Sequence, residues 1–152
     1  VLKALYEQHK DIACRLVASD IDAAMVAATR ENLALAGGTD IVTCDTCDIL
    51  ASAAPESAER GAILLNPPYG GRMGDPVRLR DTYLDIGGFL ETHAAAYDGF
   101  VFTGNPELAE AAGLRTERMQ TFYSGRIACA LLENPRLTPE ALAQFRRRDA
   151  RR

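Results

Sequence analysis

Apolar residues along this chain follow two spacings that alternate from one end of the sequence to the other. Runs of consecutive apolar residues are typical of buried strands, whereas apolar residues three or four positions apart indicate helices. The clearest helix is expected over Ala23–Ala36, where Met25 and Leu33 share one face and Gly37-Gly38 follows as a stop signal. The apolar run Ala62–Leu65 is instead expected as a strand.

The same reading of the whole chain predicts an α/β fold. The expected helices are Val1–His9, Ala23–Ala36, Val77–Tyr97 and Pro106–Ala112. The expected strands are Ala13–Ser19 with its end at Asp20, Asp40–Cys44, Ala62–Leu65, Phe100–Thr103, Arg115–Tyr123 and Arg126–Glu133. Alternating strands and helices imply a mostly parallel sheet with right-handed crossovers. The last two strands meet at Ser124-Gly125, which predicts an antiparallel hairpin at the sheet edge.

Length and composition fit one ordinary globular domain. The chain has 152 residues, of which 47% are hydrophobic and 25% charged. It contains no apolar run of about 20 residues and no signal-peptide pattern at its start, so we expect a cytoplasmic protein with no membrane segment. The four scattered cysteines suit a reducing compartment. We expect a partial catalytic domain over residues 1–135 and a helix, basic tail or linker over residues 136–152.

The net charge of −4 is unfavourable for a protein that grips a polyanion unaided. If the substrate is RNA, most phosphate contacts must come from another module. The arginine-rich stretch Arg146–Arg152 is a local exception, which fits a solvated end or the start of a linker. The chain starts at Val1, without Met and within an expected helix, so we expect it to be a piece of a longer protein.

The motif Asn66-Pro67-Pro68-Tyr69-Gly70 follows directly after the expected strand Ala62–Leu65. It resembles the catalytic loop of S-adenosylmethionine (SAM)-dependent enzymes that methylate amino groups on planar systems. The lone pair of such an amine is delocalised, so it must be localised and aimed. The Asn66 side-chain oxygen and the Pro67 carbonyl can each accept one N–H of the amine, which is catalysis by placement without a general base.

The other residues of the motif have matching roles. Pro67 and Pro68 fix their own φ angles and push the preceding residues toward extended geometry. Tyr69 offers a flat face on which the target ring can stack, worth about 1–3 kcal/mol per base. The plainer alternative is a surface turn, since Asn-Pro and Pro-Pro pairs are common in turns. The preceding strand, the Tyr and the following glycines favour the catalytic reading.

Two acidic residues stand at expected strand ends. Asp20 is placed to accept hydrogen bonds from the ribose hydroxyls of a nucleoside cofactor, with Ile21 against the adenine face. Asp48 is placed to accept the adenine amino group, next to Ile49. The plainer alternatives are a helix-capping role near Asp20 and an Asx turn at Asp48. Asn66 completes the expected cofactor contacts.

Other candidates are weaker. Arg72 could hold a phosphate of the target nucleotide, donate to the target base, or be an ordinary surface arginine. Gly70 and Arg72 are counted with Tyr69 as expected substrate contacts. Cys44-x-x-Cys47 has no second pair to complete a zinc site, so we interpret the cysteines as core or loop residues and expect no metal.

The order and spacing of these features resemble the RlmL-like family of THUMP-associated (UPF0020-type) RNA guanine-N2-methyltransferases. The resemblance rests on Ala18–Asp22 with Arg30–Gly37, on Leu65–Gly74, and on Phe122–Leu131. It implies a class I methyltransferase sheet, SAM as cofactor, and methylation of the exocyclic amine of guanine in RNA, with large-subunit ribosomal RNA as the expected partner.

The chain also departs from that family. The glycine-rich turn after the first strand, the first strand itself and the amino-terminal THUMP module are not found. We therefore expect weak SAM binding and self-association of the isolated chain. Two further functions remain open: an adenine-N6 or protein-glutamine methyltransferase, which would use the same loop chemistry, and an inactive remnant with a binding role.

Overall fold

The computed structural model describes residues 16–52, 61–69, 76–92, 94–114, 118–136 and 140. The chain divides into two compact units, Val1–Ser52 and Ala53–Arg152. Within the described part, no helix is both long and apolar enough to cross a lipid bilayer. The expected helix Val1–His9 lies outside the described residues, as does nearly all of 136–152.

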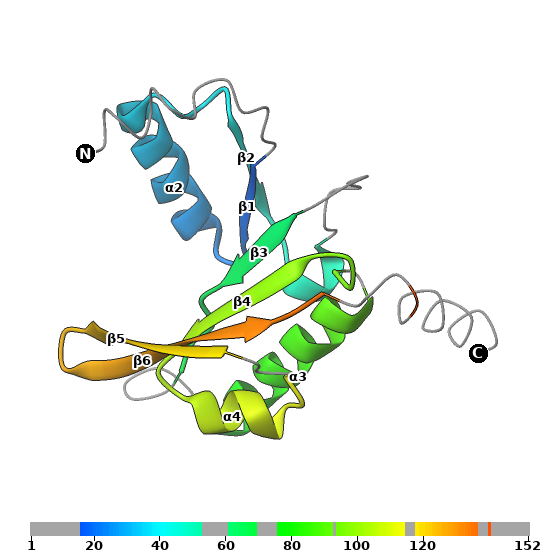
Figure 1. Ribbon diagram of the computed structural model, residues 1–152. Helices are drawn as coiled ribbons and strands as arrows, with labels where there is room; N and C mark the ends of the chain where they lie inside the picture. Colours follow the sequence, from blue (N-terminus) through cyan, green and yellow to red (C-terminus); the bar gives the residue numbers. More distant parts are fainter. Residues whose placement is uncertain are drawn as a thin grey trace. The chain divides into compact units, whose positions relative to one another are not determined.

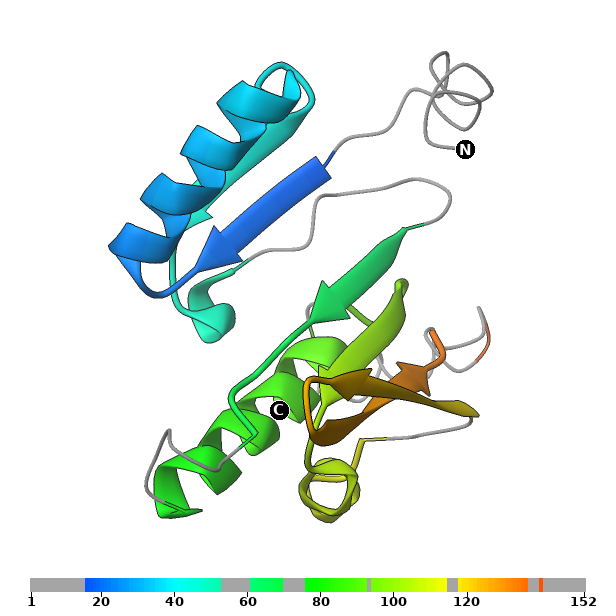
Figure 2. The ribbon, with the colours of Figure 1, turned by 90° about the vertical axis from the view of Figure 1, so that its left-hand side faces the viewer.

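The first unit is a two-stranded parallel sheet with one helix packed on it. Strand β1 (Leu16–Asp20) pairs with β2 (Val42–Thr46) in parallel, and helix α2 (Ala23–Ala36) connects them. Figure 2 shows α2 lying along one face of this pair. The short 3-10 helix η1 (Ile49–Ala51) follows β2. This unit therefore contains a strand–helix–strand crossover, as the sequence predicts.

The bounds of α2 are set by its capping residues. The Asp22 carboxylate accepts the backbone N–H of Ala24 at 2.8 Å, which caps the first turn. Gly37 ends the helix with φ of 73°, a left-handed conformation that favours glycine. The carbonyl of Gly38 then accepts the N–H groups of Ile41 and Val42. This turn delays β2 to Val42, two residues after the predicted start.

The second unit is a four-stranded sheet in the order β3-β4-β6-β5. Its strands are β3 (Ala62–Leu65), β4 (Asp98–Thr103), β5 (Arg118–Ser124) and β6 (Ile127–Asn134), and its helices are α3 (Pro76–Thr92) and α4 (Pro106–Ala111). β3 and β4 are parallel, whereas β6 is antiparallel to both β4 and β5. The predicted hairpin is confirmed, and its turn contains Gly125 with φ of 63°.

The core of the second unit lies between the sheet and α3. Both helices lie on the same face of the sheet (Figure 1), and that face carries the buried side chains of Val101, Thr103 and Leu132. The opposite face carries Leu64, which is 71% exposed, and Phe122, which is 43% exposed. Side chains in register share a face, so the two faces differ clearly in how much apolar surface they leave to solvent.

Two predicted boundaries in this unit differ clearly from the structure. Helix α3 ends at Thr92 rather than Tyr97, because the N–H of Ala94 bonds back to the carbonyl of Phe89 at 3.1 Å and closes the helix. Strand β4 begins at Asp98, two residues early, through its pairing with β3. The glycine pair Gly87-Gly88, although unfavourable in helices, lies inside α3 without breaking it.

Candidate functional site

Asp20 and Asp48 lie at the same end of the sheet in the first unit. β1 and β2 run in parallel, with Asp20 in register with Thr46. The backbone N–H of Cys47 donates to the Asp20 carbonyl at 3.1 Å, so the residue before Asp48 is tied to the end of β1. The structure thus brings together the two carboxylates that the sequence assigns to a cofactor.

Each of these carboxylates is oriented by a local backbone donor. One Asp20 oxygen accepts the N–H of Asp22 at 2.8 Å, and one Asp48 oxygen accepts the N–H of Leu50 at 2.9 Å. Both side chains are exposed, and within the described residues their second oxygens have no hydrogen-bond partner. Oriented acceptors with a free oxygen fit the hydroxyl and amine donors of a nucleoside.

The apolar neighbours of these carboxylates are available to a planar group. Ile21 is 70% exposed, and Ile49 is half-buried. An exposed isoleucine beside two oriented acceptors is consistent with contact to an adenine face. The local turns at Asp20 and Asp48 also match the capping and Asx alternatives, because Asp48 is the N-cap residue of η1. The same residues can serve both purposes through different oxygens.

A separate hollow in the first unit contains none of the expected site residues. It has a volume of about 280 Å³ and is lined by Arg30, Leu33, Thr39, Val42 and Cys44. The Arg30 guanidinium donates to the Cys44 carbonyl at 2.6 Å, so this charge is engaged with the backbone.

The proline motif lies in the second unit, directly after β3. Burial alternates along it: Asn66 is exposed, Pro67 is buried, Pro68 is exposed and Tyr69 is half-buried. Such alternation continues the extended course of β3, as the two prolines predict. Within the described residues the Asn66 side chain has no hydrogen-bond partner. Its amide oxygen is therefore presented to solvent at the carboxyl end of a strand, on an anchored backbone.

The Tyr69 ring is held against the end of β4. A Cβ atom placed on Gly104 would lie 2.6 Å from Cδ2 and 3.0 Å from Cε2 of Tyr69, and 3.2 Å from Cγ2 of Ile127. The Cδ2 and Cε2 atoms of the ring therefore lie against Gly104, with Ile127 beside them. Since Tyr69 is only half-buried, part of the ring stays open to solvent.

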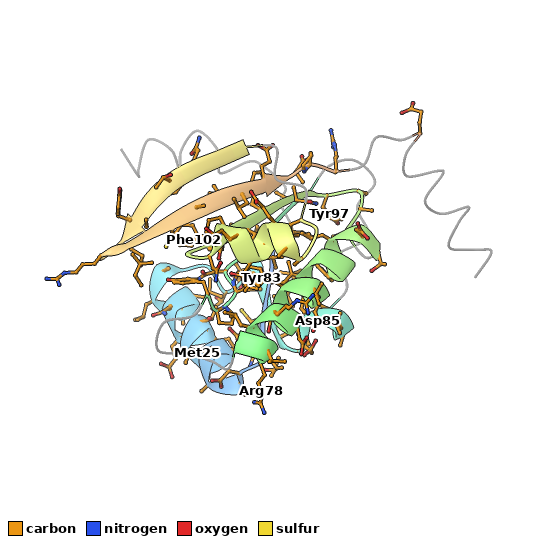
Figure 3. All side chains as sticks on the ribbon, turned by 90° about the horizontal axis from the view of Figure 1, so that it is seen from below. Met25, Arg78, Tyr83, Asp85, Tyr97 and Phe102 are labelled. Carbon is orange, nitrogen blue, oxygen red and sulfur yellow. The ribbon has the colours of Figure 1, made fainter. Side chains whose placement is uncertain are left out.

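Beneath this contact, a buried pair of hydroxyls joins α3 to β4. The Tyr83 and Thr103 hydroxyls hydrogen-bond to each other, and Thr103 Oγ1 also accepts the N–H of Asn105 at 2.9 Å. Figure 3 shows Tyr83 between helix and sheet, whereas Arg78 on the same helix extends outward. Burial raises the pKa of Tyr83, its bond to Thr103 lowers it, and the charge of Tyr69 raises it further.

Sequence reasoning did not find Tyr83, Thr103 or Gly104. Tyr83 sits on the apolar stripe of α3 and Thr103 ends an apolar strand, which are ordinary positions for both types. Gly104 follows β4 as glycines often follow strands. Of the predicted substrate contacts, Gly70 and Arg72 lie outside the described residues.

The cysteines in the described part match their predicted reading. Cys44 and Cys129 are buried, Cys47 is half-buried, and all three carry free thiols. Within the same residues, no three His, Cys, Asp or Glu side chains gather in a way that could hold a metal ion.

Comparison with solved structures defines the class of fold. The chain matches the crystal structure of SMU.472 complexed with SAH at a TM-score of 0.76 and 21% identity, over 84% of this chain and 33% of that one. This likeness confirms the predicted class I methyltransferase fold, with its parallel strands and terminal antiparallel hairpin.

The family follows from sequence comparison. The model of the family described as "UPF0020: RMKL-like, methyltransferase domain" matches residues 1–133, and the chain belongs to this family. It is 38% identical over 119 residues to the ribosomal RNA large subunit methyltransferase K/L of Syntrophotalea carbinolica, which covers 77% of this chain. It is 34% identical over 125 residues to the protein of that name from Legionella pneumophila strain Lens, covering 82% of this chain. The chain spans 17% of the length of each relative.

Proposed function

We propose that this chain is part of a SAM-dependent RNA methyltransferase that acts on the exocyclic N2 amine of guanine in large-subunit ribosomal RNA. The observation that carries the proposal is the proline motif after β3. Its asparagine amide is exposed, its first proline is buried, and its tyrosine ring rests on the end of β4. Family membership and the names of the relatives support ribosomal RNA as the substrate.

The roles of the loop residues follow from the chemistry of the amine. The Asn66 oxygen and the Pro67 carbonyl each accept one N–H of the target amine, which directs its lone pair out of the ring plane. Pro67 and Pro68 keep these acceptors extended. The open part of the Tyr69 ring stacks on the target base, and Gly70 and Arg72 contact the same nucleotide. No residue needs to remove a proton before transfer.

The cofactor contacts belong mainly to the first unit. The free oxygen of Asp20 accepts from the ribose hydroxyls, and Asp48 accepts from the adenine amine. Ile21 and Ile49 contact the adenine faces, and Asn66 is kept as the further cofactor contact that the motif suggests. SAM supplies an activated methyl group when it is bound. These assignments are supported by the oriented carboxylates with free acceptor oxygens.

The wider setting of the activity is also a proposal. With a net charge of −4, the chain relies on an additional RNA-binding module for most phosphate contacts. We propose the cytoplasm as its location, because the relatives are named as ribosomal RNA methyltransferases of bacteria. We further expect the isolated chain to self-associate, because Leu64 on the edge strand β3 is 71% exposed.

Mass spectrometry of nucleosides from purified large-subunit ribosomal RNA tests the function. We expect N2-methylguanosine at one site to disappear when the gene is deleted and to return with the wild-type gene but not with Asn66→Ala. Loss of N6-methyladenosine instead would support the adenine alternative. An unchanged set of modified nucleosides would contradict the proposal and favour the protein-glutamine alternative or the inactive remnant.

A further inference from the structure

The contact between Tyr69 and Gly104 is tighter than a side chain at position 104 would permit. The shortest distance from a Cβ at that position to the Tyr69 ring would be 2.6 Å, below any separation that real Cβ atoms show. Ile127 limits the space on a second side, because its Cγ2 would lie 3.2 Å from the same Cβ position. The only residue that leaves this space empty is glycine.

The backbone conformation at this position does not itself require glycine. In the described residues the glycines with positive φ are Gly37, Gly113 and Gly125, and Gly104 is not among them. An alanine could therefore adopt the local backbone without strain. The requirement for glycine at position 104 comes from the space that the Tyr69 ring occupies.

We infer that Gly104 is a positioning residue for the reaction: its missing side chain sets the height of the Tyr69 ring above the end of β4, with Ile127 as a lateral wall. This inference rests on the proposed role of Tyr69 as the stacking surface for the target base. The Cδ2 and Cε2 atoms of the ring lie against Gly104, so the solvent-exposed part of this half-buried ring is the part that receives the base. A methyl group at position 104 displaces the ring from the position in which the base stacks.

The size of the effect follows from the geometry. To restore ordinary contact at 3.4 Å or more, the ring must move by several tenths of an ångström. A displacement of about 1 Å at a reacting centre costs about 100-fold in rate, so we expect Gly104→Ala to lower kcat about 10- to 100-fold. The KM for SAM should change less than about twofold, since the first-unit contacts are untouched.

Two other glycines supply matched controls. Gly88 lies inside α3 with no atom within 4 Å of its built Cβ, so Gly88→Ala is expected to keep full activity. Gly99 is on β4 itself, and a Cβ there would lie 3.0 Å from Cδ2 of Leu90. Gly99→Ala is expected to lower the melting temperature without lowering kcat, which separates destabilisation from positioning.

The assay uses the full-length polypeptide encoded by the gene, with ribosomal RNA from the deletion strain. We expect Gly104→Ala to lower kcat in the wild-type background and to cause no further loss in the Tyr69→Ala background. An unchanged kcat, or an equal loss in both backgrounds, would overturn the inference. If Gly104→Ala does not fold, Ile127→Ala removes the other wall, and a kcat equal to wild type in that variant would overturn it.

A second readout does not depend on the methyl acceptor. With 3-fluorotyrosine incorporated, the fluorine resonance of Tyr69 can be assigned through Tyr69→Phe. We expect this resonance to shift in Gly104→Ala and to stay in place in Gly88→Ala. If no RNA is methylated but the resonance shifts, the proposed function fails and the ring contact stands. A resonance unmoved by Gly104→Ala overturns the positioning role whatever the RNA result.

Discussion

Removal of the Tyr83 hydroxyl should destabilise the second unit by a predictable amount. Tyr83 is fully buried, and its hydroxyl bonds the Thr103 hydroxyl. A net hydrogen bond contributes about 1 kcal/mol, and a buried partner left without one costs about 1–3 kcal/mol. Thr103 keeps its bond from Asn105 in Tyr83→Phe. We therefore expect this variant to lose about 1–2 kcal/mol of unfolding free energy.

Replacement of the partner should cost more. Thr103→Val removes the acceptor of Asn105 and the partner of Tyr83 together, so we expect a loss of about 2–4 kcal/mol. Thr103→Ser keeps both bonds and loses one methyl group, which costs about 0.8 kcal/mol. Either Tyr83→Phe or Thr103→Val alone already breaks the hydrogen bond between the two hydroxyls. The double variant should therefore lose less unfolding free energy than the sum of the losses in the two single variants. Losses that add within about 0.3–0.5 kcal/mol would refute the coupled pair.

The same pair predicts a pH dependence. Burial raises the pKa of Tyr83 above 10.0, the value taken for the unfolded chain. Its stabilising effect is therefore fully present below pH 10.0 and is lost as the pH rises through the folded pKa, because the unfolded chain releases the proton first. Urea unfolding, monitored by circular dichroism, should show that the difference in unfolding free energy between wild type and Tyr83→Phe becomes smaller above pH 10.0. A constant advantage at all pH values would contradict the burial argument.

Three further substitutions test the remaining assignments. Asn66→Ala should raise the barrier by about 2.7–4 kcal/mol. Calorimetry should find a smaller loss of SAM affinity, because Asp20 and Asp48 supply the main cofactor contacts; normal turnover with lost SAM affinity would contradict the catalytic role of Asn66. Asp20→Ala should raise the Kd for SAM before it affects turnover, and equal affinities would remove the ribose role. Leu64→Lys should reduce self-association of the 152-residue chain in sedimentation experiments, and a wild-type chain that stays monomeric at all concentrations would contradict that expectation.

The elements that the sequence predicts well are those fixed by neighbouring residues. Helix α2 has the predicted bounds because Asp22 caps its start and Gly37 ends it, and both signals are local. The extended course of Asn66 to Tyr69 is likewise set by the prolines within it. The end of α3 was missed by five residues because no residue type marks it. The bond from Ala94 to the Phe89 carbonyl closes that helix, and the sequence carries no sign of such a bond.

In the candidate site, too, the sequence predicts what depends on local position and misses what depends on tertiary contacts. Asp20, Asp48 and Asn66 could be predicted as candidates because each lies at or just after the carboxyl end of a strand: Asp20 ends β1, Asp48 follows β2 by two residues, and Asn66 directly follows β3. Tyr69 was assigned a role from its place in the motif, but what holds its ring was not predictable. Gly88 and Gly104 are both glycines, and the backbone conformation at each position would allow a side chain.

What distinguishes them is a neighbour that lies distant along the chain. Gly88 faces open space, whereas Gly104 lies against the ring of Tyr69, which is 35 positions earlier in the sequence. Steric demands of this kind arise from tertiary packing, so they leave no period or spacing in the sequence. If kcat falls in Gly104→Ala and not in Gly88→Ala, the stacking surface for the base is built jointly by the loop after β3 and the end of β4. The proline motif alone is then insufficient to define that surface.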